Sequence, residues 1–150
     1  MRHSPRNIPH RNRSPYGWCI AAYLQRFEYD DEDKTNSSRR CFAWENTILL
    51  KAKDRDGAYA KARRIGRESN DTARGPDGRK GKFRFEGLTL LLPVYEELGD
   101  GAEVLWRERS NIAVRTVRAL VKRKAALAVF DDTAGSGDAV PSPRARGASR

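Results

Sequence analysis

Two stretches of equal length, rich in aromatic, β-branched and aliphatic residues, constrain this chain most. Residues 17–29 read GWCIAAYLQRFEY, residues 41–53 read CFAWENTILLKAK, and the polar residues 30–40 join them. Runs of this kind bounded by polar connections are typical of β-strands. Their equal lengths predict a hairpin in which Trp18 lies opposite Ala52 and Ile20 opposite Leu50. The even-numbered residues of both strands then form the apolar face, and a slip of one residue would mix the two faces.

A helix is predicted directly after the second strand. Asp54 is suited to cap it, because an aspartate side chain accepts hydrogen bonds from the free amides of the first helical turn. Ala58, Ala62 and Ile65 share one face at helical spacing, and small residues there allow close packing on a sheet. Gly66 is a plausible end of this helix.

Two more strands and a second helix are expected in the rest of the chain. Residues 82–86 alternate strictly and predict a third strand with Phe83 and Phe85 pointing inward. Residues 103–108 predict a fourth strand, and Ser110 is expected to cap a helix over about 110–130. The order ββαββα indicates an α+β fold, with a four-stranded antiparallel sheet and helices packed on one face.

Composition divides the chain into a domain and two tails. Residues 1–15 and 134–150 are rich in proline, glycine, serine and arginine and have no apolar periodicity, so both are expected to be disordered. The single domain then covers residues 16–133. The chain has no apolar run near the roughly 20 residues that cross a bilayer. It also has no apolar leader at its start, so a cytoplasmic location is expected.

The net charge of +10 lies in the two tails and in the expected last helix, while the rest of the chain is electrically balanced. Basic side chains gather on the polar face of that helix: Arg115, Arg118, Lys122 and Arg123. Such a face can contact nucleic acid, although a solvated basic face is the more common explanation. A nucleic-acid-associated protein that uses this helix and the two basic tails is therefore the alternative function that the sequence leaves open.

Several enzyme classes are excluded by residue types. Both histidines, His3 and His10, lie in the first tail, so the domain lacks the histidine of Ser-His-Asp and Cys-His sites. Cys19 and Cys41 are too few for a four-thiolate zinc site. The predicted hairpin keeps these cysteines apart, so both are expected to be free, buried or half-buried, and slow to alkylate. The chain has no glycine-rich phosphate loop, and neither a cofactor nor a metal is expected.

The odd-numbered face of the predicted sheet is the candidate site. Aromatic residues on an exposed surface are typical of protein interfaces, and we expect a non-enzymatic, immunity- or adaptor-type protein that binds a protein partner there. Glu45, Glu86 and Glu103 could also hold a metal ion in a hydrolase, although cross-strand ion pairing explains them more simply. The candidate partner-binding residues are Tyr23, Gln25, Phe27, Glu45, Arg84, Glu86, Glu103 and Arg107.

The order of these segments resembles a bacterial family known as domain of unknown function 4288. Trp18 with its strand, residues 44–52 (WENTILLKA), the Ala58-x-x-x-Ala62 helix, residues 82–88 (KFRFEGL) and residues 101–104 (GAEV) carry the resemblance. It covers about residues 17–109 and excludes the basic helix and both tails. Gly57 stands where the family often has a glutamate. The resemblance implies a small α+β domain and no particular activity.

Overall fold

The structure, a computed structural model, describes residues 8–75, 77–130 and 132. Chain contacts divide it into two compact units, one reaching Leu105 and one beginning at Trp106. Of the two predicted tails, residues 1–7 and 134–150 lie outside the described part. Residues 8–15 of the first predicted tail include a 3-10 turn over His10–Asn12.

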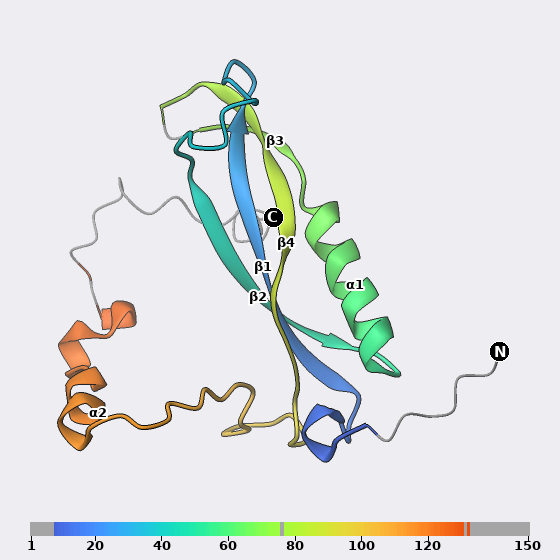
Figure 1. Ribbon diagram of the computed structural model, residues 1–150, viewed down its shortest axis with the longest axis vertical. Helices are drawn as coiled ribbons and strands as arrows, with labels where there is room; N and C mark the ends of the chain where they lie inside the picture. The colour runs from blue at the N-terminus through green and yellow to red at the C-terminus, as the bar shows by residue number, and fades with distance from the viewer. Residues whose placement is uncertain (1–7, 76, 131, 133–150) are drawn as a thin grey trace. The chain divides into compact units, whose positions relative to one another are not determined.

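The first unit has the predicted α+β fold. Its described strands are β1 (Trp18–Tyr29), β2 (Ala43–Lys51), β3 (Thr72–Arg74) and β4 (Lys80–Pro93), and they form one antiparallel sheet in the order β2-β1-β4-β3. Helix α1 (Arg55–Glu68) lies along one face of this sheet (Figure 1). We call the sheet face under α1 the inner face and the opposite one the outer face. With α2 (Val114–Leu120) in the second unit, the element order is ββαββα, as predicted.

The predicted pairing of β1 with β2 is wrong by one residue. Trp18 lies opposite Lys51, and Cys19 lies opposite Leu50. The inner face therefore carries odd-numbered residues of β1 together with even-numbered residues of β2. The apolar pattern misled the prediction because β1 is apolar on both faces: Ile20 on the outer face and Ala21 on the inner face are both buried. The positions of apolar residues along β1 therefore did not distinguish the two registers.

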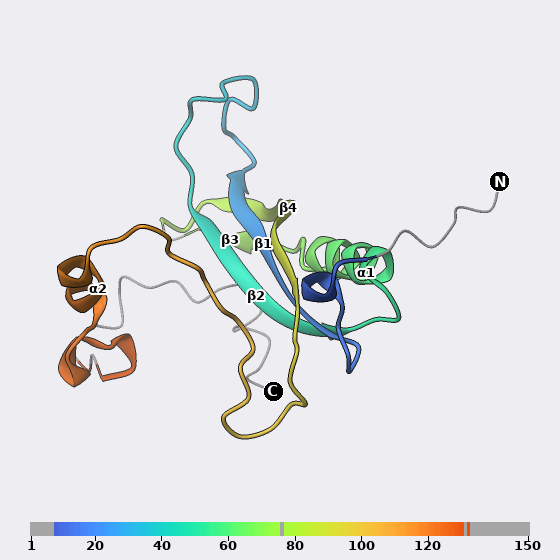
Figure 2. The same ribbon diagram turned by 60° about the horizontal axis from the view of Figure 1, so that its bottom comes forward.

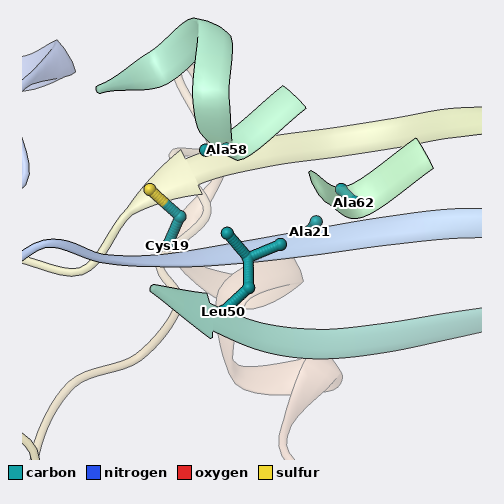
Figure 3. Close-up of a cluster of buried hydrophobic side chains, with 5 residues drawn as sticks. All are labelled: Cys19, Ala21, Leu50, Ala58 and Ala62. Carbon is teal, nitrogen blue, oxygen red and sulfur yellow. The ribbon is translucent and has the colours of Figure 1, made fainter. Parts of the chain in front are cut away.

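The inner face has two apolar clusters. Near the start of α1, the cluster is made of small side chains that point toward one another from β1, β2 and the helix (Figure 3): Cys19, Ala21, Leu50, Ala58 and Ala62. The second cluster is aromatic, with Phe27, Tyr29 and Phe83 buried and Trp44 packed against them. Ala58 and Ala62 are thus buried as predicted. Trp18 and Ile20, which were expected under the helix, lie on the outer face instead.

Helix α1 begins where the sequence predicts and ends later. The Asp54 carboxylate accepts a hydrogen bond from the backbone N–H of Gly57 at 2.7 Å. Gly66, expected to end the helix, is a buried residue inside it. A β-carbon at this position would lie 2.4 Å from Cε2 of Phe85, so glycine permits a close approach of the helix to β4.

The third and fourth strands also differ from the prediction. The predicted strand 82–86 is the first part of β4, which continues to Pro93. Its apolar run 88–92 does not alternate simply, because the pairing with β1 shifts after Ala22 and again after Leu24. Such irregularities change which face a side chain occupies. The predicted strand 103–108 is not regular structure, and Thr72–Arg74 supplies the remaining strand.

The predicted helix 110–130 is broken into short pieces. Asn111 has a left-handed backbone (φ 51°), and α2 does not begin until Val114. It ends at Leu120, and two 3-10 turns follow at Lys124–Ala126 and Ala128–Phe130. None of these three elements has a buried residue, so no apolar core supports a continuous helix within the part described.

Candidate functional site

The structure separates the residues predicted to form one open sheet face. Tyr23, Gln25 and Phe27 lie on the inner face and are 0–1% exposed. They do not form the open surface that the sequence predicted, because the one-residue change of register turns them toward α1. Glu45, Arg84 and Glu86 do lie on the outer face, as the contacts below show. Glu103 and Arg107 belong to no described strand.

Gln25 has a structural role that its predicted exposure did not suggest. Its side-chain Nε2 donates to the Ser69 backbone oxygen at 2.9 Å, and its Oε1 accepts from Asn46 Nδ2 at 3.3 Å. Ser69 ends α1, so this polar pair ties the end of the helix to β1 and β2. A buried side-chain amide without hydrogen-bond partners would destabilise the fold, and these two bonds prevent that.

Ion pairs around Glu28 occupy one end of the outer face. The Glu28 side chain is 6% exposed and lies 3.1 Å from Nη2 of both Arg26 and Arg84. Arg26 Nε also lies 2.5 Å from Glu86 Oε1. From the 30–42 connection, Arg39 and Lys34 approach the same carboxylate.

These contacts set the charge state of Glu28. Burial alone would raise the pKa of its carboxyl group. Hydrogen bonds from Arg26 and Arg84, together with their positive charges, outweigh burial and lower the pKa. The carboxylate is therefore held in its ionised form, and the positive charges of the two arginines are matched locally. Sequence reasoning placed Arg84 and Glu86 near each other but missed Arg26 and Glu28, their main partners.

The three glutamates of the metal hypothesis are not gathered. Glu86 pairs with Arg26, Glu45 accepts a hydrogen bond from the Thr89 hydroxyl at 2.5 Å, and Glu103 donates its backbone N–H to Glu96. Among the described residues, no group of three or more His, Cys, Asp or Glu side chains is placed to hold a metal ion. The geometry therefore gives the hydrolase hypothesis no support.

Strand β2 lies at an edge of the sheet, and its second side pairs with no strand among the described residues. Phe27 N donates to Phe42 O and Ala52 N donates to Gly17 O, each at 2.9 Å. Hydrogen-bonded pairs alternate along an antiparallel ladder, so the even-numbered residues of β2 bond to β1. The odd-numbered residues between these two points direct their N–H and C=O groups to the free edge. The Lys51 backbone oxygen follows this pattern, because it accepts a hydrogen bond from Lys61 Nζ, which lies on α1 and not on β1.

Two exposed leucines accompany this free edge on the outer face. Leu49, opposite Ile20, is 43% exposed, and Leu24, opposite Glu45, is 38% exposed. Between them lies the exposed Thr47, opposite Ala22. At the other edge of the sheet, the three-residue β3 pairs only with residues 80–82 of β4. The sequence predicted these leucines as strand residues but did not single them out.

The four basic residues of the expected last helix are all exposed. Arg115 and Arg118 lie on α2, whereas Lys122 and Arg123 follow it in irregular chain. Large apolar residues of the same segment are exposed beside them: Val114, Val117, Leu120, Val121, Leu127, Val129 and Phe130. The predicted single basic face therefore does not form as one helical surface.

Both cysteines are free, as predicted. Cys19 is buried, and burial raises the pKa of its thiol. Cys41 is exposed, so the expectation that both cysteines are buried or half-buried is wrong for Cys41. In the described part of the chain, no helix combines the length and the apolar character needed to cross a bilayer.

Comparison with known proteins identifies the family. The family model described as "Domain of unknown function (DUF4288)" matches residues 18–106. No curated protein and no solved structure matches the chain. The matched segment spans the four strands and α1 and leaves out α2. Since this match covers more than half of the chain, the protein belongs to the DUF4288 family.

Proposed function

We propose that this protein binds a partner protein by adding an extended segment of the partner to the free edge of β2 (Figure 2). The observation that carries the proposal is the row of outward main-chain groups at Glu45, Thr47 and Leu49. An unpaired edge of this length is a template for strand addition. In such complexes the main-chain bonds supply affinity, and alternate side chains supply specificity.

The side chains around the edge suit a protein partner. Leu49 and Leu24 offer apolar contacts on the outer face, and Glu45 and Lys51 place one charge of each sign along the edge strand. Arg26 and Arg84 are paired with Glu28 and Glu86, so the outer face does not present a basic stripe to phosphates. Nucleic-acid binding would depend on the cations of the second unit and of the two basic tails, and it is an outcome that the experiment below distinguishes.

The test uses the full chain and its partners captured from the native host, in parallel with and without nuclease. Thr47→Pro removes an N–H that makes no bond within the sheet, and proline is tolerated at edge strands for this reason. Thr47→Ala keeps the N–H and is the matched control. We expect Thr47→Pro to lose the captured partner and Thr47→Ala to retain it, with circular dichroism showing that both fold.

Amide exchange measured by NMR gives a second readout. In the free chain, the amides of Glu45, Thr47 and Leu49 should exchange quickly, while those of Asn46, Ile48 and Leu50 are protected. Binding of the partner should slow exchange at the odd-numbered positions. A complex that forms with these amides still unprotected, or that Thr47→Pro leaves intact, would contradict strand addition. A partner lost only on nuclease treatment would favour the nucleic-acid alternative.

A further inference from the structure

A cavity of about 430 Å³ lies where α1 begins and where β1 and β4 meet the 8–14 segment. Apart from Ser14, its buried and half-buried lining is apolar: Ile8, Cys19, Ala52, Ala58, Leu91, Leu92 and Pro93. This volume falls in the range of small-molecule sites, which are mostly apolar with a few polar groups that orient the ligand. The cavity is separate from the free edge of β2.

The cavity wall formed by the 8–14 segment is held in place by hydrogen bonds. Ser14 Oγ donates to the Trp18 backbone oxygen at 2.6 Å. The Tyr95 hydroxyl donates to the Arg11 backbone oxygen, and Arg13 Nε donates to the Ile8 oxygen at 2.7 Å. The cavity is therefore formed before any ligand arrives.

The exposed rim of the cavity is positively charged. Arg13, Lys53 and Arg55 contribute three cations, and Asp54 contributes one carboxylate, which is engaged in capping α1. Within the described residues, neither Lys53 nor Arg55 forms an ion pair or a side-chain hydrogen bond. These two cations have no partner there, directly above an apolar interior.

We propose that this cavity binds a small organic anion with an apolar portion, its charge matched by Lys53 and Arg55 and its apolar part packed against Leu91 and Ala58. Carboxylates and phosphate monoesters both have this chemistry. A neutral or cationic molecule of the same shape would bind more weakly, because the positive charges of the rim would not attract it. The site is independent of partner binding at β2.

Cys19 provides a reporter inside the cavity. In a Cys41→Ser chain it is the remaining thiol, and its reaction with two thiosulfonate reagents of similar size can be compared. One carries a sulfonate (2-sulfonatoethyl methanethiosulfonate), and the other a trimethylammonium group. We expect the anionic reagent to be favoured over the cationic one, relative to the same ratio measured on the urea-unfolded chain.

The rim is tested by Lys53→Gln/Arg55→Gln, with Arg40→Gln/Arg67→Gln as a control that removes the same charge away from the cavity. Each rim cation, at roughly 7 Å from the charge on a bound reagent, attracts the anionic reagent and repels the cationic one with an energy reduced by water and salt. Removing both cations should therefore lower the anion-to-cation ratio of reaction rates roughly tenfold in the rim variant. The control should change the ratio far less. Equal ratios in the native and unfolded chains, or equal falls in both variants, would overturn the proposal.

Ligand protection completes the test. Octanoate and octyl phosphate should each slow the modification of Cys19, whereas octan-1-ol and octylammonium at the same concentration should not. The relative strength of the two anions distinguishes a carboxylate site from a phosphate site. Equal protection by all four compounds would show an apolar cavity without charge selection, and protection by none would show that the cavity takes no such ligand.

Discussion

Strand β2 presents two different surfaces from alternating residues. On the inner face, Leu50 is 3% exposed and packs with α1 and β1, whereas on the outer face its neighbour Leu49 is 43% exposed. The same contrast separates Asn46, bonded to Gln25, from the exposed Thr47. Both faces of β2 carry a leucine and a polar side chain, so coverage by α1, and not side-chain polarity, determines which face is buried. Stability and binding are therefore assigned to different sides of one strand.

The two leucines give the largest expected difference between the faces. Leu50→Ala removes a buried side chain, and such changes cost about 2–5 kcal/mol of unfolding free energy. Leu49→Ala changes an exposed residue, and surface changes usually stay within about 0.5 kcal/mol. Urea denaturation of both variants measures the difference. Similar losses for both would show that the outer face is also covered.

Glu28 tests how the ion pairs of the outer face contribute. We expect Glu28→Gln to lower the free energy of unfolding at neutral pH by about 1–3 kcal/mol, since it weakens hydrogen bonds between charged groups. Folding lowers the pKa of this carboxyl group, so its contribution is present above the ordinary glutamate pKa and is lost as pH falls through the lowered value.

The measurement is a series of urea midpoints over pH. The gap between wild type and Glu28→Gln should narrow as the solution is acidified. Glu68→Gln is the control, because Glu68 pairs with Arg64 on the exposed surface of α1, where an ion pair contributes roughly 0–1 kcal/mol. A gap that stays constant down to pH 2 would show that Glu28 acts through packing and not through charge.

The smallest expected effect concerns Tyr23 on the inner face. Its hydroxyl is buried and has no hydrogen-bond partner among the described residues. Removing an unsatisfied buried polar group is neutral or favourable, so Tyr23→Phe should leave the free energy of unfolding from urea denaturation unchanged or raise it by up to about 1 kcal/mol. Tyr29→Phe is the matched control, because the Tyr29 hydroxyl interacts with Asp77. A marked loss in Tyr23→Phe would reveal a partner for this hydroxyl.

Local signals predicted the fold class, the Asp54 cap and the buried alanines of α1, because each depends on residues close in sequence. The hairpin register could not be predicted from apolar residues, since β1 is apolar on both faces. The bonds of Gln25 to Asn46 and Ser69 favour the observed register, and they join three elements that a sequence does not show together. The free edge of β2 was likewise hidden, because strand order depends on contacts between distant segments.

The close approach at Gly66 implies uneven mutational tolerance along α1. A β-carbon there would meet the Phe85 ring at 2.4 Å, so even alanine, the best helix former, would move the helix or displace the ring. The exposed Arg64 and Arg67 on either side carry no such restriction. In a library of single substitutions, position 66 should accept almost nothing, while the exposed positions 64 and 67 accept most residues. The spacing between helix and sheet would thus be recorded in the library as a sharp fall in tolerance at position 66.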